Sequence, residues 1–311
     1  MERQWFIAAP RADAEATRRA LLGSGLLDPS HKPRQEGDFV RFPILSWCEG
    51  AEEGEFEPVP GQPVLPRHEL IGGIAVMQEP DREAAALLLG SRPSLHTVLY
   101  PESDVEGEYR TRRFTVLAGR DTTRTRYLEY HHRFTIDLSQ AYFSARLSQE
   151  RQRILAQVAP AELVLDMFAG VGPFAITLAS RSRLVVASDI NPGAMLLLEE
   201  NVTRNRVTNV LGMLADASRL PAILPWRFDR VVMNLPLGGD RFLGAAFRLC
   251  RPGGIIHFYA LQDDEGAHLM NIRQYPVSSV TERKVRTYSP GRWHAVYDIR
   301  VGDAEQDQPG C

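Results

Sequence analysis

The sequence is poor in cysteine and contains no long apolar run. Its three cysteines, Cys48, Cys250 and Cys311, are widely spaced and odd in number. They exclude a disulfide framework and the spacing of zinc ligands, and they predict reduced thiols in a cytoplasm. No window approaches the ~18 uninterrupted apolar residues of a membrane-spanning helix. The first residues lack the apolar core and cleavage site of a signal peptide. We therefore expect a cytoplasmic protein with no metal site and no membrane partner.

Lysine is also scarce: Lys32 and Lys284 are the only lysines among 36 basic residues, and arginine carries the rest of the positive charge. The net charge is −3, which argues mildly against a general nucleic-acid coat protein. Residues 110–133 nevertheless hold seven arginines and only two acids, and residues 283–292 are also basic. Such clusters suit a phosphate-bearing partner. They equally suit a solvated face of an arginine-rich protein, so charge alone leaves both interpretations open.

The pattern of apolar residues, prolines and glycines predicts smaller modules ahead of a larger domain. In the first module, residues 11–23 favour a helix and residues 39–44 alternate like a strand. The accessory domain that follows is expected to contain strands at 71–77, 96–100, 114–119 and 133–137, and a helix at 81–89. The expected organisation is a small α/β module (1–50), a linker (51–66), an α+β accessory domain (67–140), a larger α/β domain (141–303) and a disordered tail (304–311).

Strands and helices alternate from about residue 141, which is the pattern of a doubly wound, mostly parallel sheet. We therefore expect a Rossmann-like α/β fold for the larger domain. The final apolar run, residues 293–301, is a plausible antiparallel edge strand. The other strands are expected at residues 163–166, 184–189, 210–214, 229–234 and 254–259.

The first strand of this domain runs into a glycine-rich turn and then into a helix that starts at Pro173. Gly170 and Gly172 permit a sharp turn and a close approach of the backbone to a ligand. The run from Gly170 to Ala175 also fits the G-x-G-x-x-A fingerprint of dinucleotide sites. The turn alone therefore does not separate S-adenosylmethionine from NAD, or either from a structural turn with no ligand.

Acidic residues stand at the ends of successive strands. Asp166 ends the first strand, Asp189 the second and Asp216 the third. Ligands of open α/β sheets bind at the carboxyl ends of the strands. Asp189 is placed to accept hydrogen bonds from ribose hydroxyls, and Asp216 to meet an adenine amino group. These acids favour a nucleoside-containing cofactor.

The motif Asn234-Leu-Pro236 follows the fourth strand and shifts the balance toward methyl transfer. A side-chain amide at this position can orient a planar nitrogen substrate through its carbonyl and NH₂ groups. The motif is a shortened relative of the Asn/Asp-Pro-Pro-aromatic motif of amino-directed methyltransferases. The alternative is an ordinary Asn-x-Pro turn at the end of a strand.

Together these motifs resemble the archaeal and eukaryotic tRNA (guanine37-N1)-methyltransferases. The likeness covers residues 67–300, and the first 50 residues match only loosely. The chain departs from the family pattern at Ala145, where a proline is usual, and in the stretch 127–133. The matching segments are Tyr142–Arg151, Asp166–Phe174, Asp189–Pro192, Glu200–Asn201, Met233–Pro236, Gly253–His257 and Arg283–Pro290.

The resemblance implies a class I methyltransferase domain that uses S-adenosylmethionine and acts on G37 in the anticodon stem-loop of tRNA. N1 of guanine carries a proton, so the reaction needs a base near N1 and a cation near O6. The resemblance places the base at Glu150 and the cation at Arg110, with Arg112 and Arg113 as close rivals. Asn234 would orient the guanine, and Pro236 would shape the pocket wall.

We expect a monomer that does not bind DNA. The remaining expected site residues contact either the cofactor or the RNA. A related family transfers a 3-amino-3-carboxypropyl group from the same cofactor in wybutosine synthesis. Three alternatives stay open: that reaction, a second methylation activity on a wybutosine precursor, and a non-catalytic RNA-binding role. The expected cofactor contacts are Tyr142, Arg146, Asp166, Phe168, Gly170, Gly172, Asp189, Ile190, Asn191, Asp216, Asn234 and Pro236. The expected RNA contacts are Arg112, Arg113, Arg124, Arg126, Arg286 and Tyr288.

Overall fold

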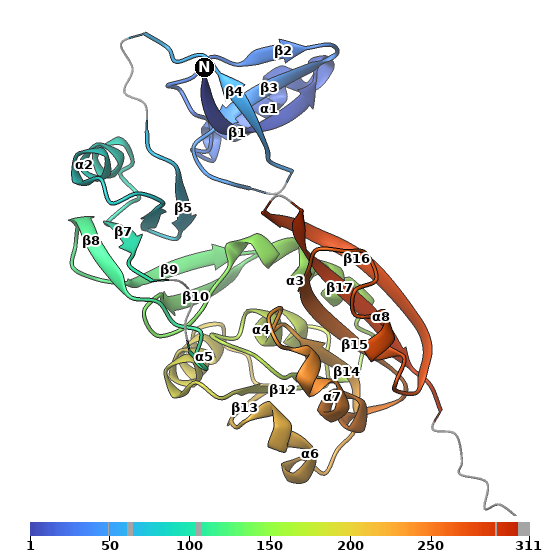
Figure 1. Cartoon of the computed structure of the whole chain (residues 1–311). Coiled ribbons are helices and arrows are strands. Elements are labelled where there is room, and N and C mark those ends of the chain that lie inside the picture. Colours follow the sequence, from blue (N-terminus) through green and yellow to red (C-terminus); the bar gives the residue numbers. More distant parts are fainter. Residues whose placement is uncertain (49, 61–64, 104–106, 290, 304–311) are drawn as a thin grey trace, which may run out of the picture. The chain divides into compact units, whose positions relative to one another are not determined.

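The computed structural model describes residues 1–48, 50–60, 65–103, 107–289 and 291–303. The contacts between residues divide the chain into two compact units, whose elements are labelled in Figure 1. The first unit contains Met1–Glu106 and Arg112–Tyr127, and the second contains Gly107–Thr111 and Leu128–Cys311. The domain boundaries that we expect from the sequence stay a prediction, and the tail 304–311 lies outside the described residues.

The first unit begins with a four-stranded sheet in the order β2-β3-β1-β4. A helix, α1 (Ala14–Gly23), covers this sheet, as the sequence predicts. The apolar side chains of Trp5, Phe42 and Ile44 pack with Leu21 of α1 to form the core. The strands are β1 (Glu2–Pro10), β2 (Arg34–Glu36), β3 (Phe39–Ile44) and β4 (Glu52–Phe56).

The interpretation of residues 51–66 as a linker is wrong for β4, which pairs antiparallel with β1. The rings of Phe56 and Phe6 lie 5.7 Å apart in the core. A side chain at Gly54 would approach the Phe6 ring to 2.9 Å, so only glycine fits there. The glutamates and glycine that made this segment look like a linker are the residues of an edge strand with one buried anchor.

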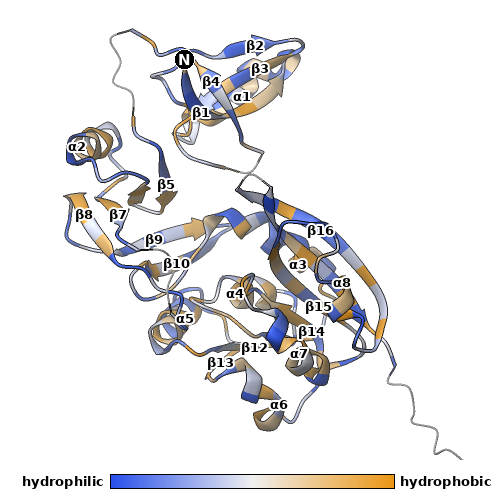
Figure 2. Ribbon diagram, viewed as in Figure 1, coloured by the Kyte–Doolittle hydropathy of each residue, from blue (hydrophilic) through white to orange (hydrophobic). Residues whose placement is uncertain are grey.

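A second sheet of the first unit has the order β5-β6-β7-β8. Its core contains Met77, Val98 and Leu117 together with Leu88 of the helix α2 (Arg82–Ser91). Figure 2 shows hydrophobic colours along β7 and β8, in contrast to the polar β2. Asp81 caps α2 by accepting hydrogen bonds from two backbone amides of the first turn. The strands are β5 (His68–Ile71), β6 (Ile74–Met77), β7 (Thr97–Pro101) and β8 (Phe114–Gly119).

The single strand expected at 71–77 is a hairpin, because Gly72 and Gly73 turn the chain between β5 and β6. Gly72 has a φ of +58°, and a Cβ there would lie 2.0 Å from the carbonyl oxygen of Arg126. Both constraints require glycine. The strand β9 (Arg124–Glu129), which the sequence did not predict, pairs with β10 (His132–Asp137).

The second unit contains a seven-stranded sheet in the order β13-β12-β11-β14-β15-β17-β16. The first five strands run parallel, which confirms the doubly wound α/β fold. The order reverses between β11 and β14, and this switch point is where such sheets bind ligands. The strands are β11 (Leu163–Asp166), β12 (Leu184–Asp189), β13 (Val210–Leu214), β14 (Phe228–Met233), β15 (Cys250–Gln262), β16 (Val277–Ser289) and β17 (Arg292–Val301).

Helices cover both faces of this sheet. Along β11, Val164 faces one apolar core and Leu165 the other, as the alternation of a strand requires. The first core is completed by α3 (Ser148–Gln157), α4 (Pro173–Ala179) and α5 (Pro192–Arg204), and the second by α6 (Leu220–Ile223), α7 (Leu243–Leu249) and α8 (Leu269–Ile272). In the described part of the chain, no helix combines the length and apolar character needed to cross a membrane.

The antiparallel strand expected at 293–301 is present as β17, but it is not the edge of the sheet. It pairs with β15 on one side and with β16 on the other. β16 is the edge strand, and its charged and polar residues concealed it in the sequence. Lysine and arginine are common on exposed edge strands because they discourage pairing with other chains.

A fully buried ion pair joins α3 to the end of β9. Arg151 donates to both carboxylate oxygens of Glu129, at 2.6 and 2.5 Å. The side chains are only 1% and 3% exposed. The guanidinium also lies 5.9 Å from the centre of the Phe143 ring and 5.8 Å from that of Phe174. Because neither charge reaches water, each depends on the other.

We expect Arg151→Ala to lower the free energy of unfolding by about 3–5 kcal/mol, because it leaves the Glu129 carboxylate buried without its partner. Urea denaturation followed by circular dichroism measures this change. The control is Arg204→Ala, which breaks the partly exposed pair with Glu200 and should cost no more than about 1 kcal/mol. Equal losses in the two variants would contradict the assignment.

Candidate active site

The glycine-rich turn between β11 and α4 adopts the conformation that its sequence predicts. Gly170 and Gly172 have φ values of +54° and +89°, a region that favours glycine. A Cβ at Gly172 would lie 3.2 Å from Leu198, so this glycine also allows close packing against α5. A Cβ at Gly170 would meet only the Tyr142 carbonyl oxygen, at 3.7 Å. The backbone at Gly170 therefore remains open to a ligand.

The sheet register brings three of the expected side chains together. Asp166 pairs with Ala187 on β12 and with Val232 on β14. Asp189 and Asn234 each lie two residues beyond those partners, at the carboxyl ends of their strands. The three side chains therefore belong to the same edge of the sheet, at the switch point.

Asp189 is fixed by the backbone of the loops around it. Its Oδ2 accepts from the amide of Gly170 at 2.7 Å, and its Oδ1 accepts from the amide of Asn191 at 2.9 Å. Burial raises the pKa of this carboxyl, and the amides of Asn191, Gly170 and Ile190 oppose the rise. Each oxygen keeps a lone pair that can accept a hydroxyl of a ribose.

Asp166 is fully buried, and neither carboxylate oxygen has a hydrogen-bond partner among the described residues. Burial raises the pKa of this acid from 3.8 to about 7, although the amides of Phe168 and Ala175, which lie near it without hydrogen-bond geometry, oppose the rise. Buried polar atoms are normally satisfied. An acid without partners beside the glycine-rich turn is thus a candidate contact for a bound group.

The neighbouring candidates differ in how they are held. Asn191 caps α5 and donates from its side chain to the Gln140 carbonyl at 2.6 Å, so it positions the loop. Asp216 accepts from the amide of Ser218 at 2.8 Å, and this bond lowers its pKa.

The two aromatic candidates differ in exposure. The ring of Phe168 packs edge-on against Phe242, with centres 5.2 Å apart. Tyr142 is exposed, so its ring is available to a ligand.

Asn234 and Pro236 follow β14 and are partly exposed. Among the described residues, the Asn234 side chain forms no hydrogen bond, so both its carbonyl and its NH₂ group are available. The carbonyl of Pro236 accepts from the amide of Leu261 at 2.9 Å, which fixes the turn after β14. A rigid turn carrying an unpaired amide suits the orientation of a planar substrate.

Glu150 lies on α3 with a side chain only 3% exposed. In the described part of the chain, three side chains donate to it. Arg153 donates to Oε2 at 2.9 Å, Tyr259 to Oε2 at 3.1 Å, and Arg283 to Oε1 at 2.7 Å. The burial of Tyr259 and the negative charge of Glu150 raise the pKa of the Tyr259 hydroxyl well above its usual value. Tyr259 therefore stays a neutral donor to the carboxylate.

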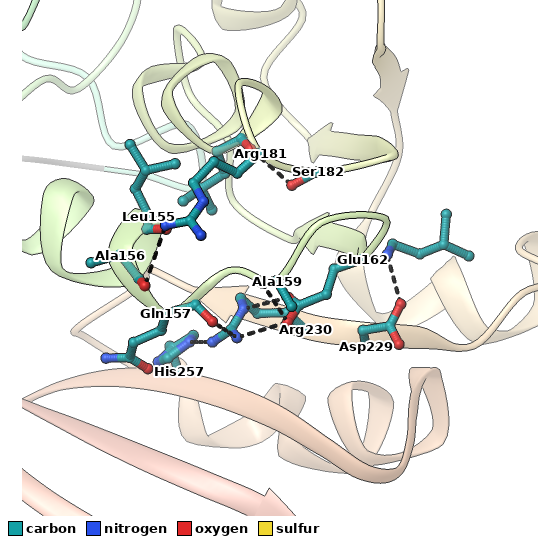
Figure 3. Close-up of polar contacts among 12 residues, drawn as sticks. Leu155, Ala156, Gln157, Ala159, Glu162, Arg181, Ser182, Asp229, Arg230 and His257 are labelled. Atoms are coloured by element: carbon teal, nitrogen blue, oxygen red, sulfur yellow. Dashed lines mark hydrogen bonds and ion pairs between the residues drawn. The ribbon is translucent and has the colours of Figure 1, made fainter.

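A chain of hydrogen-bonded polar side chains continues from Glu150 to residues of β17, β15 and β14. Arg153 forms a bidentate pair with Asp298 at 2.5 and 3.2 Å, and Asp298 lies 2.6 Å from Nδ1 of His257. The far end is Arg230, which contacts Nε2 of His257 at 2.6 Å and also pairs with Glu162 (Figure 3). Arg230 can only donate, so Nε2 accepts and the proton resides on Nδ1. Burial lowers the pKa of His257, which fits this neutral form.

Arg110 shares one electrostatic environment with Arg146 and Arg286. Burial, together with the charges of Arg286, Arg146 and Arg110, lowers the pKa of His294 to about 3. Arg110 has a φ of +55°, a left-handed conformation that costs a non-glycine residue energy. The His294 ring stacks on Tyr288, with centres 5.6 Å apart and planes 11° apart. Strain at Arg110 and the concentration of charge make this region a candidate functional site.

The other expected RNA contacts lie elsewhere in the chain. Arg110 belongs to the second unit, whereas Arg112, Arg113, Arg124 and Arg126 belong to the first. This favours Arg110 over its two rivals as the arginine beside the candidate active site. The sequence did not single out Arg153, Tyr259, Arg283, His294 and Asp298. In the sequence, only the segments Gly253–His257 and Arg283–Pro290, which resemble the family, indicated that β15 and β16 contribute to the site.

Two models of known families match the chain. A model described as the TRM5/TYW2 methyltransferase domain matches residues 125–280, about half of the chain. A second, described as the tRNA methyltransferase 5 N-terminal domain, matches residues 7–52. The chain is 34% identical to a tRNA (guanine(37)-N(1))-methyltransferase Trm5b of Pyrococcus abyssi, over 95% of this chain and 98% of that protein. The chain belongs to the TRM5/TYW2 methyltransferase family.

Other relatives and solved structures extend this result. A tRNA(Phe) (4-demethylwyosine(37)-C(7)) aminocarboxypropyltransferase of Methanocaldococcus jannaschii is 29% identical over 75% of this chain and 97% of its own. The crystal structure of Trm5b from Pyrococcus abyssi matches with a TM-score of 0.70 at 32% identity, covering 96% of this chain and all of that one. A solved complex of aTrm5 with tRNALeu matches with a TM-score of 0.71 at 27% identity, covering 96% and 99%.

Members of the TRM5/TYW2 family use S-adenosylmethionine, and the residues present here fit that cofactor. Asp189 offers lone pairs to ribose hydroxyls, and the open backbone at Gly170 admits a ligand. Asp166 supplies a buried acid without a partner among the described residues. These acceptors suit a nucleoside that carries a cationic group.

Asp189→Ala should weaken S-adenosylmethionine binding by roughly 1–3 kcal/mol, because it removes one side of a buried, charge-assisted hydrogen bond. Isothermal titration calorimetry measures the dissociation constant. Asp263→Ala is the control, since that exposed acid pairs with Arg292 and should leave the constant unchanged. An unaltered constant for Asp189→Ala would refute its assignment as a cofactor contact.

Asp166 should also make stability depend on pH. Folding raises its pKa from 3.8 to about 7, so in that window the folded state retains a proton that the unfolded state releases. Stability therefore falls as the pH rises through the window. Between pH 5 and pH 8, Asp166→Asn should gain roughly 2–3 kcal/mol relative to wild type. Urea unfolding without cofactor tests this, and parallel pH profiles for the two proteins would contradict it.

Proposed function

We propose that this protein transfers the methyl group of S-adenosylmethionine to N1 of G37 in the anticodon loop of tRNA. The observation that carries the proposal is the match of residues 7–52 to the N-terminal domain of tRNA methyltransferase 5, together with full-length similarity to Trm5b. The aminocarboxypropyltransferase relative aligns with only three quarters of this chain. Asn234 and Pro236 after β14 also favour methyl transfer.

Glu150 is the proposed base. The neutral guanine has a proton on N1, so the ring nitrogen has no lone pair to attack a methyl group until that proton leaves. Glu150 is buried, and the donors Arg153 and Tyr259 hold its Oε2. Among the described residues, only Arg283 donates to its Oε1, which so keeps a lone pair for the N1 proton. The side chain is thereby aimed before the substrate arrives.

Arg110 is the proposed partner of O6. Negative charge moves toward O6 as N1 loses its proton, and a fixed guanidinium stabilises that charge. The left-handed backbone of Arg110 is compatible with this role, because strained backbone conformations cluster at functional sites. Asn234 would orient the guanine with its unpaired amide, and Pro236 would form the adjacent wall. S-adenosylmethionine, when bound, supplies the electrophilic methyl group.

The tRNA contacts are proposed on charge and exposure. Arg286 and Tyr288 lie on β16, where Tyr288 is 55% exposed and can stack on an unpaired base. Anticodon-loop bases are unstacked easily, so entry of G37 into a pocket costs little. We propose that Arg112, Arg113, Arg124 and Arg126 bind phosphates, and that the protein acts as a monomer in the cytoplasm.

The proposed reaction is tested by incubating unmodified tRNA with cofactor labelled in either the methyl or the carboxyl group. Nucleoside mass spectrometry then identifies the product. The proposal predicts that only methyl label enters the tRNA, as 1-methylguanosine. Entry of carboxyl label would instead identify an aminocarboxypropyl transferase, and entry of neither label would indicate an RNA-binding protein without this activity.

Glu150→Gln should slow methyl transfer by about 10²–10⁴-fold, the usual contribution of a general base. The amide keeps the shape and hydrogen-bonding reach of the carboxylate but cannot take the N1 proton. The rate should be measured in a single turnover, since product release can conceal the chemical step. The defect should shrink as the pH approaches the ionisation of guanine N1, where no base is needed.

The matched control for this variant is Glu200→Gln, which neutralises a glutamate on α5 that pairs with Arg204. It should react at close to the wild-type rate. A single-turnover rate for Glu150→Gln within about twofold of wild type at neutral pH would remove Glu150 from the mechanism, because a general base contributes far more.

A further inference from the structure

We propose that Arg283 is a releasable counter-ion of Glu150, which it holds in the free enzyme and leaves for a phosphate of the bound RNA. The proposal rests on the proposed function, because it assumes that RNA enters beside Glu150. Arg153 and Arg283 both contact this carboxylate, but they differ in how firmly they are held.

Arg153 is fixed in place. Its guanidinium forms two bonds to Asp298, at 2.5 and 3.2 Å, in addition to its bond to Glu150. The side chain is 16% exposed, and the pair with Asp298 is bidentate. Departure of Arg153 would leave Asp298 with only the neutral His257, and it would remove a charged donor from the buried Glu150, which is costly. This arginine therefore stays on Glu150 throughout the reaction.

Arg283 is held much more weakly. Its Nη2 donates to Oε1 of Glu150 at 2.7 Å, and the described residues include no other ion pair of Arg283. The side chain is 55% exposed, whereas that of Glu150 is 3% exposed. A half-solvated ion pair contributes little stability. A guanidinium has five N–H groups, so this one can exchange a carboxylate for a phosphate.

The position of Arg283 on β16 supports a phosphate as the competing partner. Arg283 is paired with Val296 on β17, and Arg286 is paired with His294. His294 is the residue on which the charges of Arg286, Arg146 and Arg110 converge. An RNA backbone attracted by this charge would pass close to Arg283. The transfer of Arg283 to a phosphate would free Oε1, the oxygen that has no other donor among the described residues.

The release makes a specific prediction for RNA binding. In wild type, tRNA must break the Arg283–Glu150 pair, whereas in Glu150→Gln Arg283 is already weakly held. Glu150→Gln should therefore bind unmodified tRNA about three- to tenfold more tightly, as expected for a half-exposed charged contact. This gain should disappear when Arg283→Gln is added. Arg283→Gln alone should reduce the slope of log affinity against log salt by about one.

Filter binding of wild type, both single variants and the double variant tests this, with S-adenosylhomocysteine in place of cofactor and a series of KCl concentrations. Arg300→Gln is the control, because Arg300 is an exposed arginine on β17 that donates to the Gly253 carbonyl. In its background the gain from Glu150→Gln should persist. Arg283→Lys, which keeps the charge, should retain the wild-type salt slope and confirms that position 283 tolerates substitution.

A tightening that survives in the Arg283→Gln background would overturn the proposal, because it would then reflect the long-range effect of removing one negative charge. An unchanged salt slope for Arg283→Gln would also overturn it, since no phosphate contact would be lost. Both are binding measurements made without turnover. Failure of the proposed function would appear separately, as an absence of methyl transfer to tRNA by wild type.

Discussion

The buried charge of Glu150 is the constraint around which this domain is organised. A carboxylate removed from water is stable only when it is paired and hydrogen-bonded. Here the partners come from four elements: Arg153 from α3 itself, Tyr259 from β15, Arg283 from β16 and, through Arg153, Asp298 from β17. Satisfying this charge therefore ties α3 to the antiparallel end of the sheet. That end extends beyond the parallel strands that form the cofactor site.

The order of the strands connects this charge with the cofactor site. β11 and β14 are neighbours although 61 residues separate the end of one from the start of the other. Their pairing places the glycine-rich turn and Asn234 at one edge of the sheet, with Asp189 on the adjacent strand. The segment that precedes α3 contains Tyr142, whose carbonyl lies near Gly170. One end of the sheet thus carries groups suited to the cofactor, the base and the substrate amide.

The sequence predicted the parts of this arrangement that depend on short-range patterns. The glycine-rich turn, the acids at strand ends and the Asn-x-Pro turn each occupy a few consecutive residues, and the structure gives them the expected places. The partners of Glu150 could not be found in this way, because Tyr259 and Arg283 lie 109 and 133 residues further along the chain. No local pattern encodes such a pairing.

Edge strands were the other weakness of the sequence interpretation. β4 and β16 are rich in charged residues because one side of each faces solvent, so β4 resembles a linker and β16 is not recognised as a strand. Conversely, the apolar run of β17 is typical of an interior strand, which is where the structure places it. The choice of Arg110 over Arg112 and Arg113 stays a proposal, which rests on its backbone conformation and on its place in the second unit.

The most direct test is a crystal structure of Glu150→Gln with an unmodified anticodon stem-loop and S-adenosylmethionine. We expect N1 of G37 to lie within hydrogen-bond distance, about 2.6–3.2 Å, of the side chain at residue 150. We also expect Arg110 to face O6, Arg283 to contact a phosphate, and Arg153 to remain on Asp298. A complex in which G37 is bound at the cofactor with N1 out of reach of residue 150 would contradict the role of Glu150 as the base.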